Sequence, residues 1–438
     1  MVHQLKEGEM NRTRDQFTMS SLCRLVRGVF SQHNQDRVGR YKISTTDCLM
    51  SAFALFSLKY PSLLQFDKEL SHEKALRHNL GSLFGIKHIP CDTQMRERLD
   101  GLSFTNPRIA MKSVLARLQR AKVLEQWQFM GHYLVSLDGT GFFSSSQIHC
   151  PQCCEKHHRN GTTTYSHQMV VGSIVHPSLR QVLPIGFEPI VKSDGQQKND
   201  CERNASKRWL AEFRRQHPQL PTIIVADGLS ANAPFIKLLE HYRCHYILVC
   251  QKDDHKYLWD WFWKAEKPDV VAFEETVEKI HKSYRFMENV PLNESSDRLV
   301  TVVFYQETHP KGRKISWGWI TDLPVTAQNV REIVKGARTR WKIENETFNT
   351  LKNQDYHFEH NYGHGLKTLS NVLAGLMLLA FLIDQCLEAV NLEFQKALKK
   401  MGQRIRLWYK LRSGFQWLHI ETWEKLYASI LDPPTFNL

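Results

Sequence analysis

Two short apolar runs, each followed by an Asp-Gly pair, constrain the fold of this chain more than any other feature. Residues 132–137 read HYLVSL and precede Asp138, and residues 222–226 read TIIVA and precede Asp227. Continuous apolar runs of this length are typical of strands that are buried on both faces. An acid at the end of such a strand is held by a rigid scaffold and still reaches solvent, which is where open α/β sheets place their active sites.

The segments around these runs predict an α/β (α+β) layer structure. Residues 165–175 and 181–191 continue the strand pattern, residues 199–217 and 232–243 have helical spacing, and residues 245–250 read as another strand. The order is therefore three strands, a helix, a strand, a helix and a strand. Short apolar strands that alternate with helices favour a mixed sheet flanked by helices.

Pattern and length divide the 438 residues into several parts. We expect a helical N-terminal region (1–130), a catalytic core (131–251 and 325–385), a β-rich insertion within the core (252–324) and a basic helical C-terminal region (386–438). Arg and Lys recur in the N-terminal region, which either binds DNA or packs with a solvated basic face. Residues 394–420 hold seven Lys or Arg and no acid.

The charge balance suggests a polyanionic partner. Lys and Arg outnumber Asp and Glu by 58 to 45, and a net charge of +13 favours nucleic acid, although a merely basic soluble protein is the alternative. The polar N-terminus and scattered cysteines predict a cytoplasmic, nucleoid-associated protein with reduced or metal-bound thiols. The apolar stretch 369–387 contains Asp384 and other polar residues, so we expect a buried core helix and no membrane partner.

A helix expected around residues 335–353 supplies a third acid. Hard cations such as Mg²⁺ take oxygen ligands, so a few carboxylates suffice for a site. Arg340, Glu344 and Phe348 are spaced by four residues and share one face, where the Arg can steady the Glu or contact a phosphate. Glu346 is the rival acid, but it points away from that face. Each acid alone would read as a turn or a surface residue; together they indicate a metal site.

With these motifs in place, the chain resembles the DDE transposases of bacterial insertion sequences, which have a ribonuclease-H-like core. It is most similar to the insertion-sequence-4-like branch, which carries a β-rich insertion before the last acid and a Tyr-Arg-Glu-Lys signature on the final helix. Arg340 and Glu344 match that signature. The Tyr position is Ala337, and the Lys position is Leu351, with Lys352 one residue later.

The resemblance covers roughly residues 130–385. It implies a DNA transposase in which Asp138, Asp227 and Glu344 hold two Mg²⁺ or Mn²⁺ ions, with Asp138 bridging them. Such an enzyme hydrolyses a phosphodiester at each transposon end, and the freed 3′-hydroxyl then attacks target DNA. It implies double-stranded DNA as partner and a homodimer on paired ends. The alternatives are a related nuclease or recombinase without strand transfer, and a catalytically silent, transposase-derived DNA-binding protein.

The same resemblance assigns DNA contacts. Arg340 and Lys352 would bind phosphates near the transposon end. Trp317 and Trp319, in the expected insertion, either stack on an unpaired or flipped base or pack within the strands, and packing is the simpler interpretation.

A cluster of soft donors interrupts the first strands, since residues 149–158 read HCPQCCEKHH. Cys150 and Cys153 have zinc-knuckle spacing, and His157 and His158 follow, so these four residues could hold a structural Zn²⁺. The alternative is a polar loop with reduced thiols, because the chain has only one such Cys pair here. Further donors nearby are His149, Cys154 and His167.

Polar residues open the helix that follows the third strand, namely Asp200, Glu202, Arg203 and Asn204. Acids in a first turn suit the helix dipole, so a structural role is the default interpretation. A contribution to the rim of the active site is the alternative.

Overall fold

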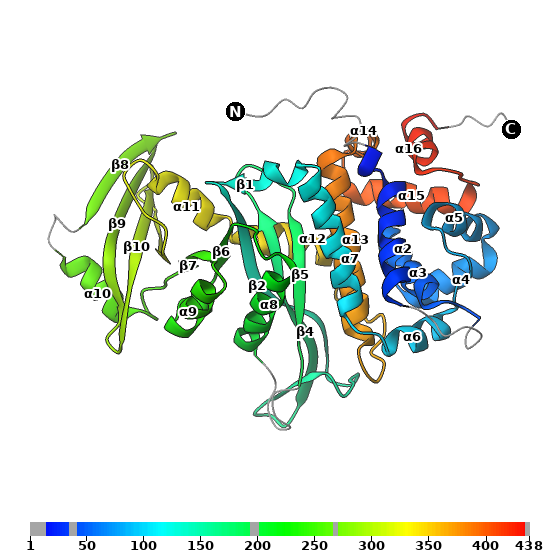
Figure 1. Cartoon of the computed structure of the whole chain (residues 1–438), viewed down its shortest axis with the longest axis horizontal. Helices are drawn as coiled ribbons and strands as arrows, with labels where there is room; N and C mark the ends of the chain where they lie inside the picture. Colours follow the sequence, from blue (N-terminus) through cyan, green and yellow to red (C-terminus); the bar gives the residue numbers. More distant parts are fainter. Residues whose placement is uncertain (1–14, 35–41, 193–200, 266–269, 434–438) are drawn as a thin grey trace.

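The structure is a computed structural model that describes residues 15–34, 42–192, 201–265 and 270–433. The molecule is elongated, with a β-rich end, a central sheet flanked by helices, and an opposite end built from the first and last helices of the chain (Figure 1).

The N-terminal part of the described chain is helical. Its helices are α2 (Met19–His33), α3 (Thr45–Ser57), α4 (Leu63–His72), α5 (Lys74–Phe84), α6 (Asp92–Asp100) and α7 (Thr105–Arg120), followed by the 3₁₀ turn η1 (Val123–Trp127). All 13 residues of α3 are buried, as expected for a helix that is apolar on every side. The Ser44 hydroxyl caps α3 by accepting a hydrogen bond from the Asp47 amide.

A single mixed sheet runs through the molecule. Its strands are β1 (Gln128–Phe129), β2 (His132–Ser145), β3 (Cys154–His157), β4 (Thr163–Val175), β5 (Leu183–Ile190), β6 (Thr222–Ala226), β7 (His245–Val249), β8 (Val271–Val277), β9 (Ile280–Asn293), β10 (Ser296–Thr308) and β11 (Lys314–Thr321). Their order is β3-β4-β2-β6-β7-β11-β10-β9-β8, with β5 on β4 and β1 on β2. The β2–β6 and β6–β7 pairs are parallel, and the others are antiparallel. The expected mixed α/β architecture is confirmed.

Strand β2 is longer than the sequence predicts. Its apolar run ends at Leu137, but the strand continues to Ser145 because β4 pairs with it along that whole length. The parallel neighbour β6 pairs only with residues 133–136 and ends at Ala226. Asp138 therefore lies within a strand rather than directly after one, at the point where β2 loses its parallel partner.

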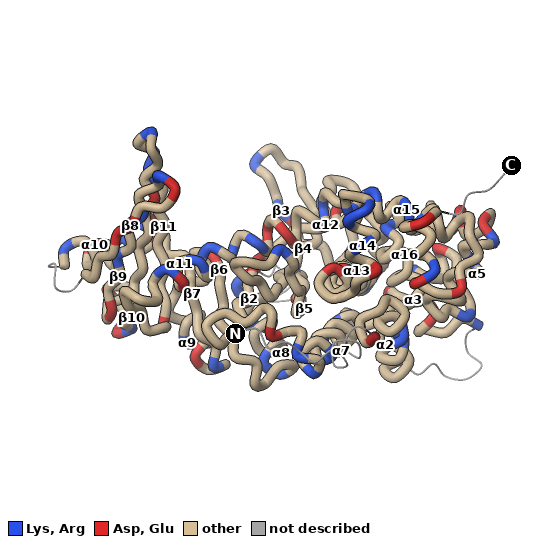
Figure 2. Tube along the Cα trace, turned by 90° about the horizontal axis from the view of Figure 1, so that it is seen from above, with Lys and Arg blue, Asp and Glu red and all other residues tan. Residues whose placement is uncertain are grey.

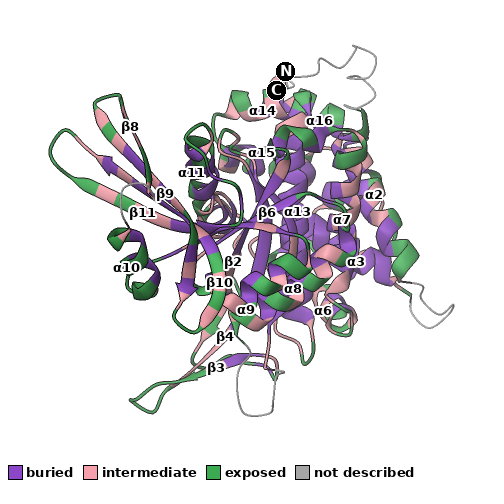
Figure 3. Cartoon of the chain, turned by 60° about the vertical axis from the view of Figure 1, so that its left-hand side comes forward, coloured by how far each residue is buried: buried purple, intermediate pink, exposed green. Residues whose placement is uncertain are grey.

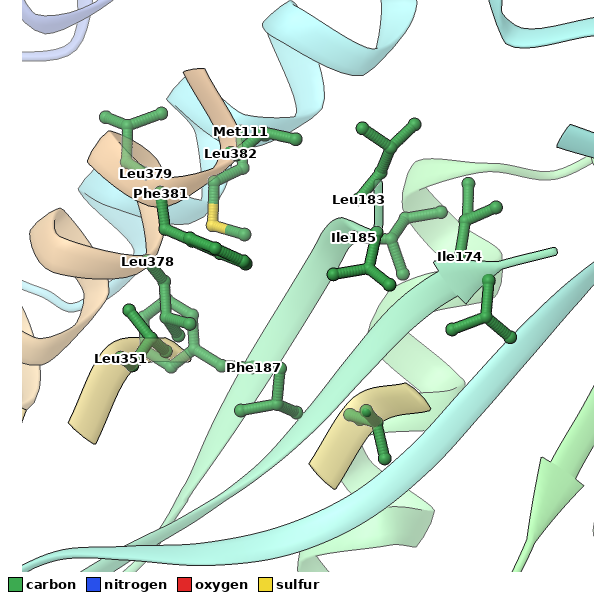
Figure 4. Packing of buried hydrophobic residues seen from close by; sticks show 14 of the residues in the cluster. Met111, Ile174, Leu183, Ile185, Phe187, Leu351, Leu378, Leu379, Phe381 and Leu382 are labelled. Atoms are coloured by element: carbon green, nitrogen blue, oxygen red, sulfur yellow. The ribbon is translucent and has the colours of Figure 1, made fainter. Parts of the chain in front are cut away.

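Helices cover both faces of the central strands. Successive β5 residues point to opposite faces: Phe187 meets Gly375 of α13 (Leu369–Val390), whereas Gly186 faces Trp209 of α8 (Glu202–Gln216). Figure 4 shows Leu378 and other side chains of α13 close to the Phe187 side of β5. The 3₁₀ turn η2 (Gly228–Ser230) and helix α9 (Ala233–His241) connect β6 to β7.

Residues 252–324 form α10 (Lys256–Lys264) and strands β8–β11 in the part that the structure describes. Strand β11 pairs with β7, so these strands extend the central sheet itself. Figure 3 shows exposed distal ends on β8, β9 and β11, in contrast to the buried β6 and α13.

The helix expected around residues 335–353 is not continuous. Helix α11 (Val330–Arg338) ends at a turn, and the π-helical segment η4 (Ile343–Phe348) precedes α12 (Asn349–Asn353). The Asn349 amide donates to the Glu344 carbonyl, five residues back. At this break the Arg340 carbonyl accepts two hydrogen bonds, from the Ser136 hydroxyl of β2 at 3.1 Å and from the Ile343 amide at 3.2 Å, so a strand contact and a tight turn both hold the chain there.

Helix α13 is the buried core helix that the sequence predicts. By length and composition alone it is the one helix of the described residues that could cross a membrane, but 89% of its most apolar stretch is buried within the protein. Asp384, the one buried acid of α13, accepts hydrogen bonds from Lys59 at 2.7 Å and from Tyr356 at 2.5 Å. The chain ends with α14 (Leu392–Met401), α15 (Arg404–Trp417) and α16 (Trp423–Leu431).

Candidate functional site

Three carboxylates from separate elements meet where β2 extends past β6. Asp138 comes from β2, Asp227 follows β6 and Glu202 lies in the first turn of α8; each offers an oxygen within 4.8 Å of the other two. All three side chains are half-buried. Oxygen donors so arranged suit a hard divalent cation such as Mg²⁺.

Local structure fixes each of these acids. Asp227 accepts a hydrogen bond from the Leu229 amide at 3.1 Å and so caps the short turn η2. Glu202 lies directly over Gly139, where a Cβ atom would come within 2.5 Å of the Glu202 Oε2. A side chain at position 139 would displace the Glu202 carboxylate, so the glycine after Asp138 permits the close approach of a second acid and is not there for a turn.

Glu202 is therefore the acid whose importance the sequence analysis underestimated. Its default role there was structural, at the start of a helix, whereas the structure places it among the three clustered carboxylates. The signal that could have identified it is Gly139, since a glycine inside an apolar strand marks a site where another group approaches closely.

The clustered acids repel one another and resist ionisation. Burial raises the pKa of Asp138 to about 6, with the charges of Asp227 and Glu344 adding to the shift and the Arg340 guanidinium opposing it. Burial, together with Asp227 and Asp138, raises the pKa of Glu202 to about 7. Burial also raises the pKa of Asp227, against the effect of Arg340. Arg340 and Arg203 offset only part of the shift at Asp227, whose pKa stays raised, so a bound cation would stabilise the ionised cluster.

Glu344 lies near this cluster without joining its inner set. Its charge acts on Asp138, but it is not among the three acids whose oxygens lie within 4.8 Å of one another. Glu346, the rival acid, points elsewhere and lies 3.5 Å from Arg180. Both glutamates lie in the π-helical segment η4, so the four-residue spacing of a regular helix predicts the directions of their side chains only in part.

Arg340 connects the acids to the surrounding surface. Its Nη1 lies 3.4 Å from the Asp138 Oδ2, and its guanidinium lies 4.4 Å from the ring centre of Trp341. The buried Arg340 Nε has no hydrogen-bond partner among the described residues. A cation beside the carboxylates with donors to spare is suited to bind a phosphate.

A cavity of about 590 Å³ opens beside Asp227. Its basic and aromatic lining includes Lys252, Trp317, Trp319, Arg338, Arg340 and Trp341. The cavity adjoins the acids on the side where β7 and β11 pair, so a ligand there would lie within reach of Asp227 and Arg340 together.

The tryptophans differ in what they expose to this cavity. Trp319 is only 2% exposed, so strand packing is the correct interpretation of that residue and base stacking is not. Trp317 is half-buried, stacked on Tyr305 with ring centres 5.5 Å apart, and its ring carries the Arg338 guanidinium at 4.7 Å. Trp341, which the sequence interpretation did not single out, is 50% exposed.

Lys352 is not brought to the cavity. It lies on α12, and its Nζ forms an ion pair with Glu359 at 2.8 Å. Across the molecule, Lys and Arg lie along its whole length, with Asp and Glu among them (Figure 2). The net charge is therefore not gathered at one place in that view.

The cysteine pair of the β2–β4 connection meets different histidines from those expected. Cys150, Cys153, His167 and His364 offer ligand atoms that all lie within 4.8 Å of one another. The expected partners are wrong: His157 and His158 are exposed and hydrogen-bond to threonine hydroxyls of the facing strand segment, Thr163 and Thr164. The pairing of β3 with β4 fixes them there, away from the cysteines.

No family model matches the chain, and no curated protein matches it. Among solved structures, the chain is similar to one described as a cryo-EM structure of a piggyBac transposase synaptic complex with hairpin DNA. The sequence identity is 10%, the match covers 98% of this chain and 83% of that chain, and the TM-score is 0.38. A likeness at this level does not establish a shared fold or activity.

Proposed function

We propose that this chain is a DDE-type DNA transposase that cleaves phosphodiester bonds at transposon ends and joins them to target DNA. The observation that carries the proposal is the meeting of Asp138 and Asp227 at two adjacent parallel strands. Glu202 offers an oxygen within 4.8 Å of both, and Glu344 and Arg340 act on Asp138 from nearby. Acids far apart in the sequence converge at one sheet edge next to a basic, aromatic cavity.

The strand arrangement supports a ribonuclease-H-like core within the larger sheet. Strands β5, β4 and β2 are antiparallel neighbours, and β6 and β7 follow on the other side of β2 in parallel. Helices α8 and α9 connect β5 to β6 and β6 to β7. This is the order of three strands, helix, strand, helix and strand on which the family resemblance rests.

The donor set fits a hard divalent metal. Asp138, Asp227 and Glu202 would hold Mg²⁺ or Mn²⁺, with Glu344 as the acid for a second ion. When bound, such ions lower the pKa of a water molecule and stabilise the charge that develops on the phosphate. The pKa values of these three carboxylates support the fit. All three are raised, and a bound cation would lower them again by stabilising the ionised form.

The other residues would position DNA. Arg340 would contact the phosphate next to the acids, because its side chain lines the cavity and its Nη1 lies 3.4 Å from Asp138. Trp341 and Trp317 offer ring surface to a nucleotide at a frayed or unpaired end. Lys352 would contribute a weaker phosphate contact from the neighbouring helix. A homodimer on paired ends, with no membrane partner and a cytoplasmic, nucleoid-associated location, belongs to the same proposal.

The test uses the full chain and labelled duplexes taken from the DNA that flanks its gene. Asp138→Asn, Asp227→Asn and Glu344→Gln should each abolish cleavage in Mg²⁺ and in Mn²⁺ while binding in a gel-shift assay changes little. Glu346→Gln is the matched control, because its partner is Arg180 and not the cluster.

The outcomes separate the alternatives. If the wild type binds these duplexes but never cuts with either metal, the chain is a silent DNA-binding protein. If it cuts and the 3′-hydroxyl ends are never joined to a target plasmid, it is a nuclease without strand transfer. If Glu346→Gln is inactive and Glu344→Gln is active, Glu346 is the third acid of the triad.

A further inference from the structure

A second donor cluster lies between the β2–β4 connection and the segment that precedes α13. We propose that Cys150, Cys153, His167 and His364 bind one structural zinc ion through two sulfurs, the Nε2 of His167 and the Nδ1 of His364. The site is separate from the carboxylates, and the inference does not depend on the proposed function.

The spacing of the four donors is that of a tetrahedral zinc site. The two sulfurs lie 3.7 Å apart. The His167 Nε2 lies 3.3 and 3.4 Å from them and 3.2 Å from the His364 Nδ1, which lies 3.9 Å from the Cys153 sulfur. With Zn–S near 2.3 Å and Zn–N near 2.0–2.1 Å, a regular tetrahedron has edges of about 3.8 Å between sulfurs, about 3.5 Å between sulfur and nitrogen, and about 3.4 Å between nitrogens.

Hydrogen bonding alone does not account for this convergence. The His167 Nε2 has four polar neighbours within 3.4 Å, namely both sulfurs, the His364 Nδ1 and the Ser370 hydroxyl. A neutral imidazole nitrogen carries either one proton or one lone pair, so it satisfies at most one of them well. A metal at the common centre explains why several donors point at one another.

Burial makes the site structural. Cys150, Cys153 and His167 are 7%, 1% and 1% exposed, and His364 is half-buried. Four protein donors leave no open position for a substrate, in contrast to catalytic zinc sites. The Cys-x-x-Cys turn is itself ordered, because the Cys153 amide donates to the Cys150 carbonyl at 3.1 Å and the Cys150 amide to the Cys153 sulfur at 3.4 Å. Such contacts orient thiolate ligands toward a metal.

The proposed ion would tie together distant parts of the chain. His167 lies on β4 opposite Phe143 of β2, the strand that carries Asp138. His364 lies 197 residues further on, in the segment that follows η4 and α12, and its ring packs edge-on against Phe143 at 4.1 Å between ring centres. Zinc would thus fix the downstream segment against the strand pair that supports the acids.

The first measurement is the zinc content of the full chain, purified without chelator. We expect about one zinc per chain in the wild type. Cys150→Ser and His364→Ala should each reduce it to well below one. His157→Ala is the matched control and should keep one, because that side chain is exposed and bonded to Thr163.

A second measurement covers variants that fail to fold. The wild-type chain, stripped of metal and given one equivalent of Co²⁺, should show the absorption of tetrahedral, thiolate-ligated cobalt. The proposal is overturned if the wild type holds no zinc and shows no such spectrum, if Cys150 and Cys153 form a disulfide, or if His157→Ala loses zinc and His364→Ala keeps it. Asp138→Asn should retain its zinc even where it cannot cut DNA, so failure of one proposal is distinguishable from failure of the other.

Discussion

The strand pair β2–β4 supports two donor clusters of opposite chemistry. The carboxylate cluster of Asp138, Glu202 and Asp227 gathers hard donors of like charge, half-buried beside a cavity of about 590 Å³. The Cys-His cluster of Cys150, Cys153, His167 and His364 gathers soft and borderline donors that are mostly buried.

We call the carboxylate cluster the open site, because a bound ion there could still take a substrate, and the Cys-His cluster the closed site. Hard cations on a few carboxylates keep coordination positions for water and phosphate. Burial, and after it the neighbouring acids, raises the pKa of Asp138 and of Glu202, and Arg340 offsets only part of the shift at Asp138. Four soft or borderline donors around one ion leave no coordination position for a substrate. Proximity of donors alone therefore does not distinguish a reactive site from a structural one; donor hardness, burial and the adjacent cavity do.

The strongest way to break the comparison is to give the open site a soft donor. Asp138→Cys should reduce Mg²⁺-dependent cleavage by roughly 10³-fold, because loss of metal-based stabilisation costs several kcal/mol. Mn²⁺, a less hard ion, should recover more activity than Mg²⁺ does. Cleavage rates with each metal, at equal DNA binding, provide the measurement. Undiminished cleavage in Mg²⁺ would remove Asp138 from the metal site.

A smaller loss of cleavage rate is expected when Glu202 is changed than when Asp138 is changed. Glu202→Gln should slow cleavage by about 10- to 100-fold and raise the Mg²⁺ concentration needed, since one of several donors is weakened. Gly139→Ala should act similarly, because its Cβ would lie 2.5 Å from the Glu202 Oε2. Gly141→Ala is the control, since its nearest new contact is a carbonyl at 3.9 Å. Equal rates for both alanine variants would show that Glu202 is a structural residue.

Local sequence signals predicted the parts of the fold and site that depend on local structure. The apolar runs before Asp138 and Asp227 marked two neighbouring strands, and those acids do meet. Cys150 and Cys153 were identified by their spacing and do lie together, at 3.7 Å between sulfurs.

What the sequence did not reveal depends on tertiary arrangement. His364 joins Cys153 across 211 residues, and no spacing rule reaches that far. Glu202 joins the carboxylate cluster only because the first turn of α8 lies over Gly139 of β2. At the break before Glu344, the Arg340 carbonyl accepts hydrogen bonds from Ser136 of β2 and from the Ile343 amide. The prediction of one continuous helix therefore ran through a turn that includes a tertiary contact.

The open site should also be visible in the pH dependence of stability. The folded-state pKa values of Asp138, about 6, and Glu202, about 7, exceed ordinary values near 4. Raised pKa values mean that protonation favours the folded state, so this contribution is fully present below about pH 4 and is lost as the pH rises through 6 to 7.

Without metal, the wild type should therefore lose about 2 to 4 kcal/mol of stability between pH 5 and pH 8 relative to an Asp138→Asn/Glu202→Gln double variant. The two raised pKa values together correspond to about 4 kcal/mol over this range, and solvent screening of the half-buried groups reduces that value. Denaturant unfolding of both proteins at several pH values measures the difference, and saturating Mg²⁺ should reduce it. Identical pH profiles for the two proteins would mean that neither burial nor the neighbouring acids raise the pKa values of these carboxylates in the folded state. The Cys-His cluster predicts no such difference, since both proteins retain it.

The smallest loss of DNA binding is expected from a substitution at Lys352. Comparing it with a substitution at Arg340 shows which path the DNA takes past the carboxylate cluster. Its ammonium pairs with Glu359 at 2.8 Å and does not line the cavity, so Lys352→Ala should weaken DNA binding by less than about twofold, with little change in the salt dependence. Arg340→Ala, which removes a cavity cation 3.4 Å from Asp138, should weaken binding more and lower the salt slope by about one phosphate contact. Gel-shift titrations of both variants at several salt concentrations give the two slopes. If Lys352→Ala has the larger effect, the DNA backbone crosses α12 on its way past the acids. In that case the cavity beside Asp227 holds at most a nucleotide end. Lys352 would then bind a phosphate, as the sequence predicts, although it pairs with Glu359 in the free protein.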